Sequence, residues 1–196
     1  MKKKGFVHIY TGEGKGKTTA AIGLTVRFAG AGGEVLFTQF LKKDTSGELA
    51  ILGQLEPVKL FLCRKSFGFT FQMTAGQKQE AAEYYSAHLS KVLAEARLAC
   101  QAASLRPQYA EGNGGNSHSP GVLLVLDEIL AAYNQGMVDR QELLAFLEQK
   151  PDNLEVALTG RDPAPELLAH ADYVTIMQME KHPYAQGVAA RRGIEW

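Results

Sequence analysis

This 196-residue chain has few cysteines and no formal net charge. Its two cysteines, Cys63 and Cys100, are too few for a disulfide framework and lack the spacing of a zinc site. Lysine plus arginine and aspartate plus glutamate each number 21, so the formal net charge is zero. A general nucleic-acid binder usually has an excess of basic residues, and the sequence therefore argues against that class.

Long hydrophobic runs are missing as well. Residues 122–126 form one of the longest, far short of the roughly 20 residues of a membrane span. Residues 2–4 are lysines, as at the start of a signal peptide, but glycines from Gly12 onward follow after only a few apolar residues. The five histidines show no H-x-x-x-H spacing, which argues against zinc. We expect a cytoplasmic protein of one domain, residues 1–196, without membrane or nucleic-acid partners.

What the chain does contain is an alternation of short β-rich runs with helical patterns. Strands are expected at 6–10, 34–40, 58–62, 122–126, 154–158 and 173–177. Helices are expected at 18–30, from Thr74, from Asp139, and from Asp162 with Pro163 at the first helical position. This order predicts an α/β fold with a mostly parallel sheet covered by helices on both faces.

Two local features refine this prediction. Gln77 follows Thr74 at the spacing of a capping box, which marks the start of a long helix. Residues 105–120 are rich in glycine, asparagine and serine, and they are expected to form a flexible surface loop because they cannot pack a core.

The strongest chemical signal is the segment TGEGKGKTT at 11–19, between the first expected strand and the first expected helix. It matches the P-loop pattern G-x-x-x-x-G-K-[ST] at its end, although Thr11 occupies the first glycine position. Its glycines can turn backbone N–H groups inward as an anion-binding nest, and Lys17 adds a positive charge. The fold is therefore expected to be P-loop NTPase-like (RecA-like). The residues assigned to the nucleotide are Gly12, Glu13, Gly14, Lys15, Gly16, Lys17, Thr18 and Thr19.

A second signal is the pair Asp127 and Glu128 at the end of the buried run 122–126. Acidic residues there project into the crevice where open α/β sheets bind ligands. In a P-loop protein such a carboxylate holds magnesium, so Thr18, Asp127 and Glu128 are the predicted ligands of Mg²⁺ or Mn²⁺. The alternative is that Asp127 only caps the following helix. Together the two motifs indicate a nucleoside triphosphate and a metal, but they name no reaction.

Five further segments follow in a fixed order: QFLK at 39–42, GFTF at 68–71, LTGR at 158–161, KHPY at 181–184 and GIEW at 193–196. With the threonine form of the P-loop, they make the chain resemble the P-loop type corrinoid adenosyltransferases, which act on cob(I)alamin or cob(I)yrinic acid a,c-diamide. The resemblance extends from Tyr10 to Trp196, and the loop after Leu105 is its main departure.

The resemblance implies a reaction. The family transfers the 5′-deoxyadenosyl group of ATP to the Co(I) of a reduced corrinoid and releases triphosphate, in adenosylcobalamin biosynthesis or salvage. Lys17 would then stabilise charge on the leaving phosphate, and Co(I) needs no general base. ATP, Mg²⁺, the corrinoid, a reductase or reduced flavoprotein, and a second copy in a homodimer are the implied partners.

The resemblance also implies roles for side chains outside the loop. Phe69 and Phe71 would lie against the corrinoid and keep the lower axial ligand off cobalt, with Phe71 replacing the tryptophan of many relatives. The alternative is that Phe67, Phe69 and Phe71 are alternating core residues of a strand. Arg161 would bind phosphate, or it is an exposed arginine in a turn. The catalytic residues predicted are Lys17, Phe69, Phe71 and Arg161.

Two other functions remain open at this point. A P-loop ATPase or nucleoside kinase would use Asp127 or Glu128 to orient a water or hydroxyl and would release phosphate or ADP. A nucleotide-dependent corrinoid-binding module would release neither product. Some family members cover the site with an extra N-terminal helix, so here another segment is expected to close the site or to leave it more open. The basic tail at 181–192 could meet phosphate or corrinoid amides, or face solvent.

Overall fold

The computed structural model describes residues 5–42, 46–65, 67–68, 72–105 and 121–194. Six strands form one sheet in the order β3-β2-β4-β5-β1-β6, and every neighbouring pair is parallel. The strands are β1 (Val7–Thr11), β2 (Glu34–Gln39), β3 (Val58–Leu62), β4 (Val122–Asp127), β5 (Leu154–Thr159) and β6 (Tyr173–Ile176). All six lie within two residues of the predicted runs, which confirms the α/β prediction.

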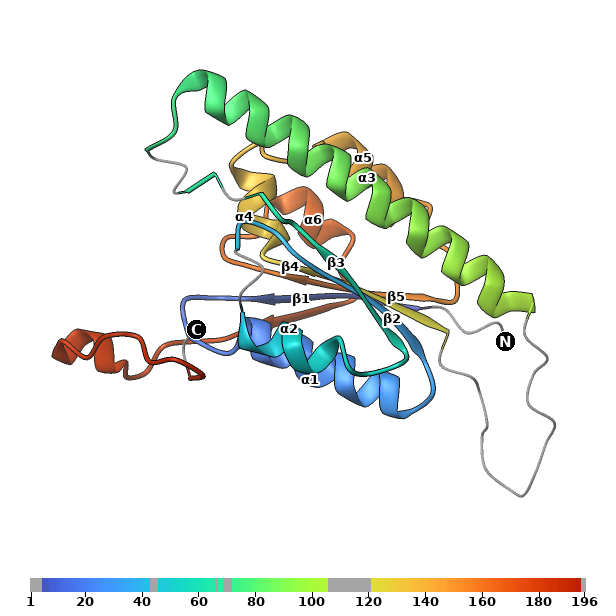
Figure 1. The fold of residues 1–196 in the computed structure, drawn as a ribbon, viewed down its shortest axis with the longest axis horizontal. Helices are drawn as coiled ribbons and strands as arrows, with labels where there is room; N and C mark the ends of the chain where they lie inside the picture. The colour runs from blue at the N-terminus through green and yellow to red at the C-terminus, as the bar shows by residue number, and fades with distance from the viewer. Residues whose placement is uncertain (1–4, 43–45, 66, 69–71, 106–120, 195–196) are drawn as a thin grey trace.

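Helices cover both faces of the sheet (Figure 1). One face carries α1 (Lys17–Gly30) and α2 (Gly47–Leu52). The other carries α3 (Ala75–Leu105), α4 (Ile129–Asn134), α5 (Arg140–Glu148) and α6 (Pro165–Ala169). A 3₁₀ turn, η2 (Pro183–Gln186), follows the last strand. No helix within the described residues is both long and apolar enough to cross a membrane.

The central strand β4 explains why the two cores form. Its residues are all buried, and alternate side chains enter opposite cores. Leu124 and Leu126 pack with α3 to α6, whereas Leu123 and Val125 pack with α1 and α2. A strand buried on both faces reads as a continuous apolar run, which is why this element was visible in the sequence.

The helix predictions hold with one exception. Thr74 and Gln77 make the reciprocal bonds of a capping box, at 2.9 Å and 3.3 Å, directly before α3. The helix expected from Asp162 and Pro163 is present, but its predicted start is wrong: α6 begins at Pro165, because Ala164 before that proline is extended, with a ψ of 145°. The predicted loop lies outside the described residues beyond Leu105, where α3 ends.

The parallel sheet positions the candidate site. Since all strands run the same way, their carboxyl ends meet at one edge of the sheet. The loop after β1, the residues after β2, the end of β4 and the turn after β5 therefore converge there.

Candidate nucleotide-binding site

The glycine-rich loop connects β1 to α1 and leaves the start of the helix open. Gly16, the residue before α1, has a φ of 111° and caps the helix with no side chain. The first N–H groups of α1 therefore face the loop, where a helix N-terminus attracts anions. The Lys17 ammonium spans the loop and donates to the carbonyl oxygens of Gly12 at 2.6 Å and Gly14 at 2.8 Å. Burial, followed by the nearby Arg161, lowers the pKa of Lys17.

Two of the loop glycines serve the packing of the chain after β6. The Gly14 N–H donates to the Met177 carbonyl at 2.7 Å, so the expectation that all three glycines turn their N–H groups inward is wrong for Gly14. A Cβ on Gly12 would lie 2.4 Å from the Met177 oxygen, and one on Gly14 would lie 2.6 Å from the Gln178 oxygen. These positions require glycine because another backbone passes so close.

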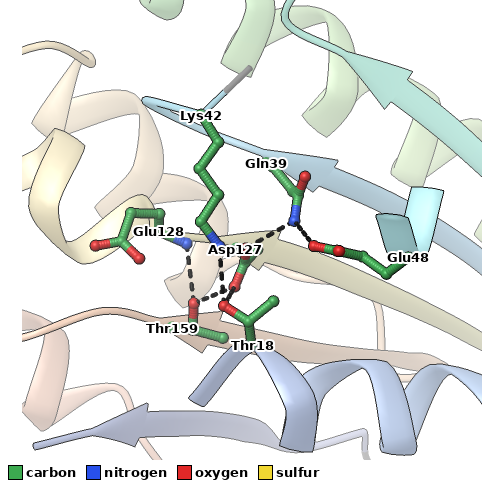
Figure 2. Close-up of polar contacts among 7 residues, drawn as sticks. All are labelled: Thr18, Gln39, Lys42, Glu48, Asp127, Glu128 and Thr159. Atoms are coloured by element: carbon green, nitrogen blue, oxygen red, sulfur yellow. Dashed lines mark hydrogen bonds and ion pairs between the residues drawn. The ribbon is translucent and has the colours of Figure 1, made fainter. Parts of the chain in front are cut away.

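The fully buried carboxylate of Asp127 is the centre of a hydrogen-bond network at the end of β4. Its Oδ1 accepts from Thr18 Oγ1 at 2.9 Å and from Thr159 Oγ1 at 2.6 Å. Its Oδ2 accepts from Gln39 Nε2 at 3.1 Å and from Lys42 Nζ at 2.7 Å (Figure 2). Lys42 also donates to Thr18 Oγ1 at 3.0 Å. The carboxylate thus has four donors from three parts of the chain, as a buried charge requires.

The carboxylates of Asp127 and Glu128 point in different directions. Asp127 does not cap α4, so that alternative is wrong: Glu128 precedes the helix, with a φ of 60° and no side-chain cap. The Glu128 N–H donates to Thr159 Oγ1 at 2.9 Å, and its carboxylate points away from Thr18 and Asp127 in Figure 2. Burial raises the pKa of Glu128, and the neighbouring Lys42 opposes that shift.

The oxygen atoms of Thr18 and Asp127 suit a hard divalent cation. Magnesium prefers oxygen ligands, and Thr18 and Asp127 present a hydroxyl and a carboxylate side by side. A positive group already bonds to both, because the Lys42 ammonium contacts one oxygen of each. Among the described residues no three His, Cys, Asp or Glu side chains gather as a metal cluster. A cation here would therefore take its other oxygens from a phosphate or from water.

Arg161 lies where the sequence placed it, in the turn after β5 at the same sheet edge. Its guanidinium is 3.3 Å from the Glu13 carboxylate, and both side chains are more than half exposed. An exposed pair of this kind contributes little to stability and can exchange for a stronger anion. The ion pair therefore keeps Arg161 beside the loop and leaves its guanidinium able to bind another anion.

A cavity of about 330 Å³ opens over the loop. One wall consists of loop residues from Glu13 to Thr19 together with Arg161. The facing wall comes from the C-terminal part of the chain, namely His182, Pro183, Val188, Ala189, Ala190 and Ile194. Sequence reasoning left the role of this tail open, and it missed Gln39, Lys42 and Thr159, which it quoted only as parts of motifs.

The segment predicted to lie against the corrinoid is described only at Phe67 and Gly68. Phe69 and Phe71 lie outside the described residues. Phe67, which precedes them, is partly buried and packs against Tyr84 and Tyr85 with ring centroids 5.7 Å apart in both pairs. A core role therefore holds for Phe67 and stays untested for the other two.

Known proteins of one family are similar to this chain over nearly its whole length. The family described as ATP:corrinoid adenosyltransferase BtuR/CobO/CobP matches residues 3–196. A corrinoid adenosyltransferase from Sinorhizobium sp is 33% identical over 198 residues, which cover 99% of this chain and 81% of that protein. One from Pseudomonas aeruginosa is 29% identical over 195 residues, covering 99% of this chain and 85% of that protein.

Solved structures support the fold alone. The cytoplasmic domain of the Thermomonospora curvata type VII secretion ATPase EccC has a TM-score of 0.52 and 15% identity, over 95% of this chain and 22% of that one. The cytoplasmic domain of EssC has a TM-score of 0.51 and 14% identity, over 95% of this chain and 35% of that one. The chain spans about a third or less of these ATPases, and the likeness confirms the P-loop NTPase-like fold.

Proposed function

The chain belongs to the ATP:corrinoid adenosyltransferase family, and from that premise we propose how its residues divide the work of the reaction. It is an enzyme that transfers the adenosyl group of ATP to a corrinoid. The observation that carries the proposal is the convergence of Lys17, Thr18 and Asp127 at one sheet edge beneath a cavity. An ATPase, a kinase or a non-catalytic binding module is not favoured by these relatives.

The loop holds the triphosphate as the leaving group. In the reaction a bond forms between cobalt and the ribose C5′, and the bond between C5′ and the α-phosphate oxygen breaks. Charge then develops on that oxygen, so groups aimed at it lower the barrier. Lys17 can exchange its two loop carbonyls for phosphate oxygens, and the open start of α1 supplies further donors. Glu13, Lys15 and Thr19 line the same cavity, and Arg161 faces it from β5.

Thr18 and Asp127 hold the metal. The ion proposed is Mg²⁺ or Mn²⁺, and when bound it would neutralise part of the triphosphate charge. The four donors on Asp127 hold its carboxylate in a fixed orientation beside Thr18. Glu128 adds negative charge to the same region, although its carboxylate points away from this pair.

The corrinoid side of the site is assigned from the family resemblance. Phe69 and Phe71 would lie against the ring and exclude the lower axial ligand, which makes Co(II) easier to reduce. Phe67 supports this placement, because it anchors the preceding chain to α3 through Tyr84 and Tyr85. A reductase or reduced flavoprotein would then supply the electron that generates Co(I).

The remaining assignments concern the whole chain. Residues 1–196 would act as one catalytic domain in the cytoplasm, and two copies would form a homodimer. The exposed edge strand β6 supports pairing, because Tyr173, Val174 and Ile176 are each close to half exposed or more. Sedimentation of the purified protein tests this: a species of one chain at micromolar concentration would refute the dimer.

Product analysis tests the proposed reaction. The protein is incubated with ATP, Mg²⁺ and a chemically reduced corrinoid, and the small products are separated. We expect triphosphate and adenosylated corrinoid in equal amounts. Phosphate or ADP would instead indicate an ATPase or kinase, and neither product would indicate a binding module. Parallel reactions with cobalamin, cobinamide and an a,c-diamide precursor show which corrinoid is preferred.

A further inference from the structure

Lys42 reaches Asp127 from a constrained turn. Leu41, between β2 and Lys42, has a φ of 57°, a left-handed conformation that is uncommon for a bulky residue. Two contacts anchor this turn. Phe40 is fully buried and donates its N–H to the Asp127 carbonyl at 2.9 Å, and the Leu41 side chain packs against the core. The fold therefore holds the backbone in a strained shape that brings the lysine to the carboxylate.

The position of the ammonium coincides with the proposed metal position. Lys42 Nζ lies 2.7 Å from Asp127 Oδ2 and 3.0 Å from Thr18 Oγ1, the two residues that would ligate the ion. Magnesium binds oxygen at about 2.0–2.1 Å, so an ion between these two residues would overlap the space that the ammonium fills. Two positive groups cannot share it.

Lys42 is also the donor best able to leave. Its side chain is 31% exposed, whereas Asp127 is fully buried and Thr159 and Gln39 sit in buried strand ends. It is the charged member among the four donors that the described residues give Asp127. Lys42 and Arg161 both act on Lys17 as like charges, so these three positive side chains lie near one another. A polyanion that reached all three would stabilise them together.

We propose that Lys42 is a positioning residue that fills the cation position in the nucleotide-free enzyme and moves to a triphosphate oxygen when the divalent cation binds Thr18 and Asp127. This inference rests on the proposed metal site. Metal alone must compete with the lysine, whereas metal arriving with a triphosphate gives the ammonium another anion to bind. The exchange keeps Asp127 paired throughout and favours joint entry of metal and nucleotide.

Two binding measurements on nucleotide-free protein test the exchange. Affinity for Mn²⁺ alone is measured by electron paramagnetic resonance, and affinity for inorganic tripolyphosphate in EDTA by calorimetry. In Lys42→Met we expect Mn²⁺ to bind about tenfold tighter, because a competing charge is gone. We expect tripolyphosphate to bind about tenfold weaker, because a charged contact is lost. Lys42→Gln, which can still donate to Asp127, should shift both affinities in the same directions if Lys42→Met does not fold.

The opposite signs distinguish exchange from a structural role, which would weaken both affinities together. Lys59→Met is the matched control and should change neither affinity. Lys59 forms an ion pair with Glu34, with Nζ 2.7 Å from Oε1, and this pair does not involve the loop. In the unaltered protein, saturating Mg²⁺ with tripolyphosphate should change the rate of Lys42 acetylation relative to that of Lys59, measured by mass spectrometry. Mn²⁺ binding that is unchanged or weaker in the Lys42 variants would overturn the inference, as would an unchanged acetylation ratio.

A further variant separates this inference from the metal site itself. If Asp127→Asn weakens Mn²⁺ binding while the Lys42 variants do not tighten it, the exchange is wrong and the metal site stands. If Asp127→Asn leaves Mn²⁺ affinity unchanged, the metal site is wrong and the inference fails with it.

Discussion

The main-chain nitrogen of Gly14 lies 2.7 Å from the carbonyl oxygen of Met177, so the phosphate loop is tied to the chain that leaves the edge strand β6. Met177 in turn donates its own N–H to the Thr11 carbonyl at 2.8 Å. These two bonds continue the pairing of β1 with β6 beyond the sheet. The shape of the loop therefore depends on the last strand as well as on its own glycines.

Gly14→Ala should disturb this junction. Its Cβ would lie 2.6 Å from the Gln178 oxygen, and backbone atoms must move to relieve that contact. We expect a loss of about 1–3 kcal/mol of unfolding free energy, together with weaker ATP binding. Gly23→Ala in α1 is the control, because its Cβ meets no atom within 4 Å and should stabilise the helix by up to about 1 kcal/mol. Equal melting temperatures for the two variants would contradict the prediction.

Lys17→Ala should remove most activity while the fold survives. The Lys17 ammonium donates to loop carbonyls and its side chain is part of neither hydrophobic core, so no core packing is lost. A lost charged contact in a phosphate site costs on the order of 3 kcal/mol, equivalent to about a hundredfold or more in rate. Turnover and ATP binding are measured beside circular dichroism, and near-normal turnover in a folded variant would refute the role of Lys17.

Asp127→Asn and Glu128→Gln should differ in their metal dependence. Asp127 bonds to Thr18 directly, whereas the Glu128 carboxylate points away from that pair. We expect Asp127→Asn to raise the Mg²⁺ concentration needed for half-maximal rate by roughly tenfold or more, and Glu128→Gln to raise it much less. The measurement is turnover against Mg²⁺ at saturating ATP. A larger effect from Glu128→Gln would contradict the prediction and would indicate that Glu128, and not Asp127, binds the metal.

The stability of Glu128→Gln should depend on pH. Burial raises the pKa of Glu128 in the folded protein, so ionising it opposes folding. The cost is absent at pH values below the pKa of the unfolded carboxyl and is complete once the pH exceeds the folded pKa. Glu128→Gln should therefore melt at a higher temperature than the parent at neutral pH, and the two should converge in acid. Glu56→Gln removes an exposed carboxylate and is the control for the loss of one negative charge.

Phe69→Ala should affect the Co(II) reaction more than the Co(I) reaction, if the ring excludes an axial ligand. Activity should fall sharply from five-coordinate Co(II) with a reductant and much less from pre-reduced Co(I). A core role would instead cost about 3–5 kcal/mol of stability and impair both assays alike. Equal losses with a large drop in melting temperature would refute the corrinoid role. Phe71→Trp should preserve or improve the Co(II) reaction.

The sequence predicted the sheet well because its central strands β2 and β4 are buried along their whole length. Glycine, proline and polar residues also bound the strands. The short helices were harder. Helices α2 and α4 have six residues each, too few for a helical period to stand out. The start of α6 was misplaced because two prolines, Pro163 and Pro165, each fit a first helical position, and the structure uses the second, with Ala164 extended before it.

The pairing of Thr18 with Asp127 was predictable, because the phosphate loop and the strand-end carboxylate form a recurring combination. Lys42 and Thr159 were not, since their contacts with Asp127 require β2 and β5 to flank β4. That strand order does not follow from the order of the strands along the chain. His182, Pro183, Val188 and Ile194 line the cavity over the loop for the same kind of reason, through the position of β6 beside β1.

The C-terminal wall of the cavity has a practical consequence for handling the protein. Ile194 lines the nucleotide cavity, so a fluorescent label attached at Ile194 would lie within the active site. The strand β1 begins at Val7, at the end of the sheet opposite the loop (Figure 1). Labels and surface-immobilisation handles are therefore better attached near the start of β1.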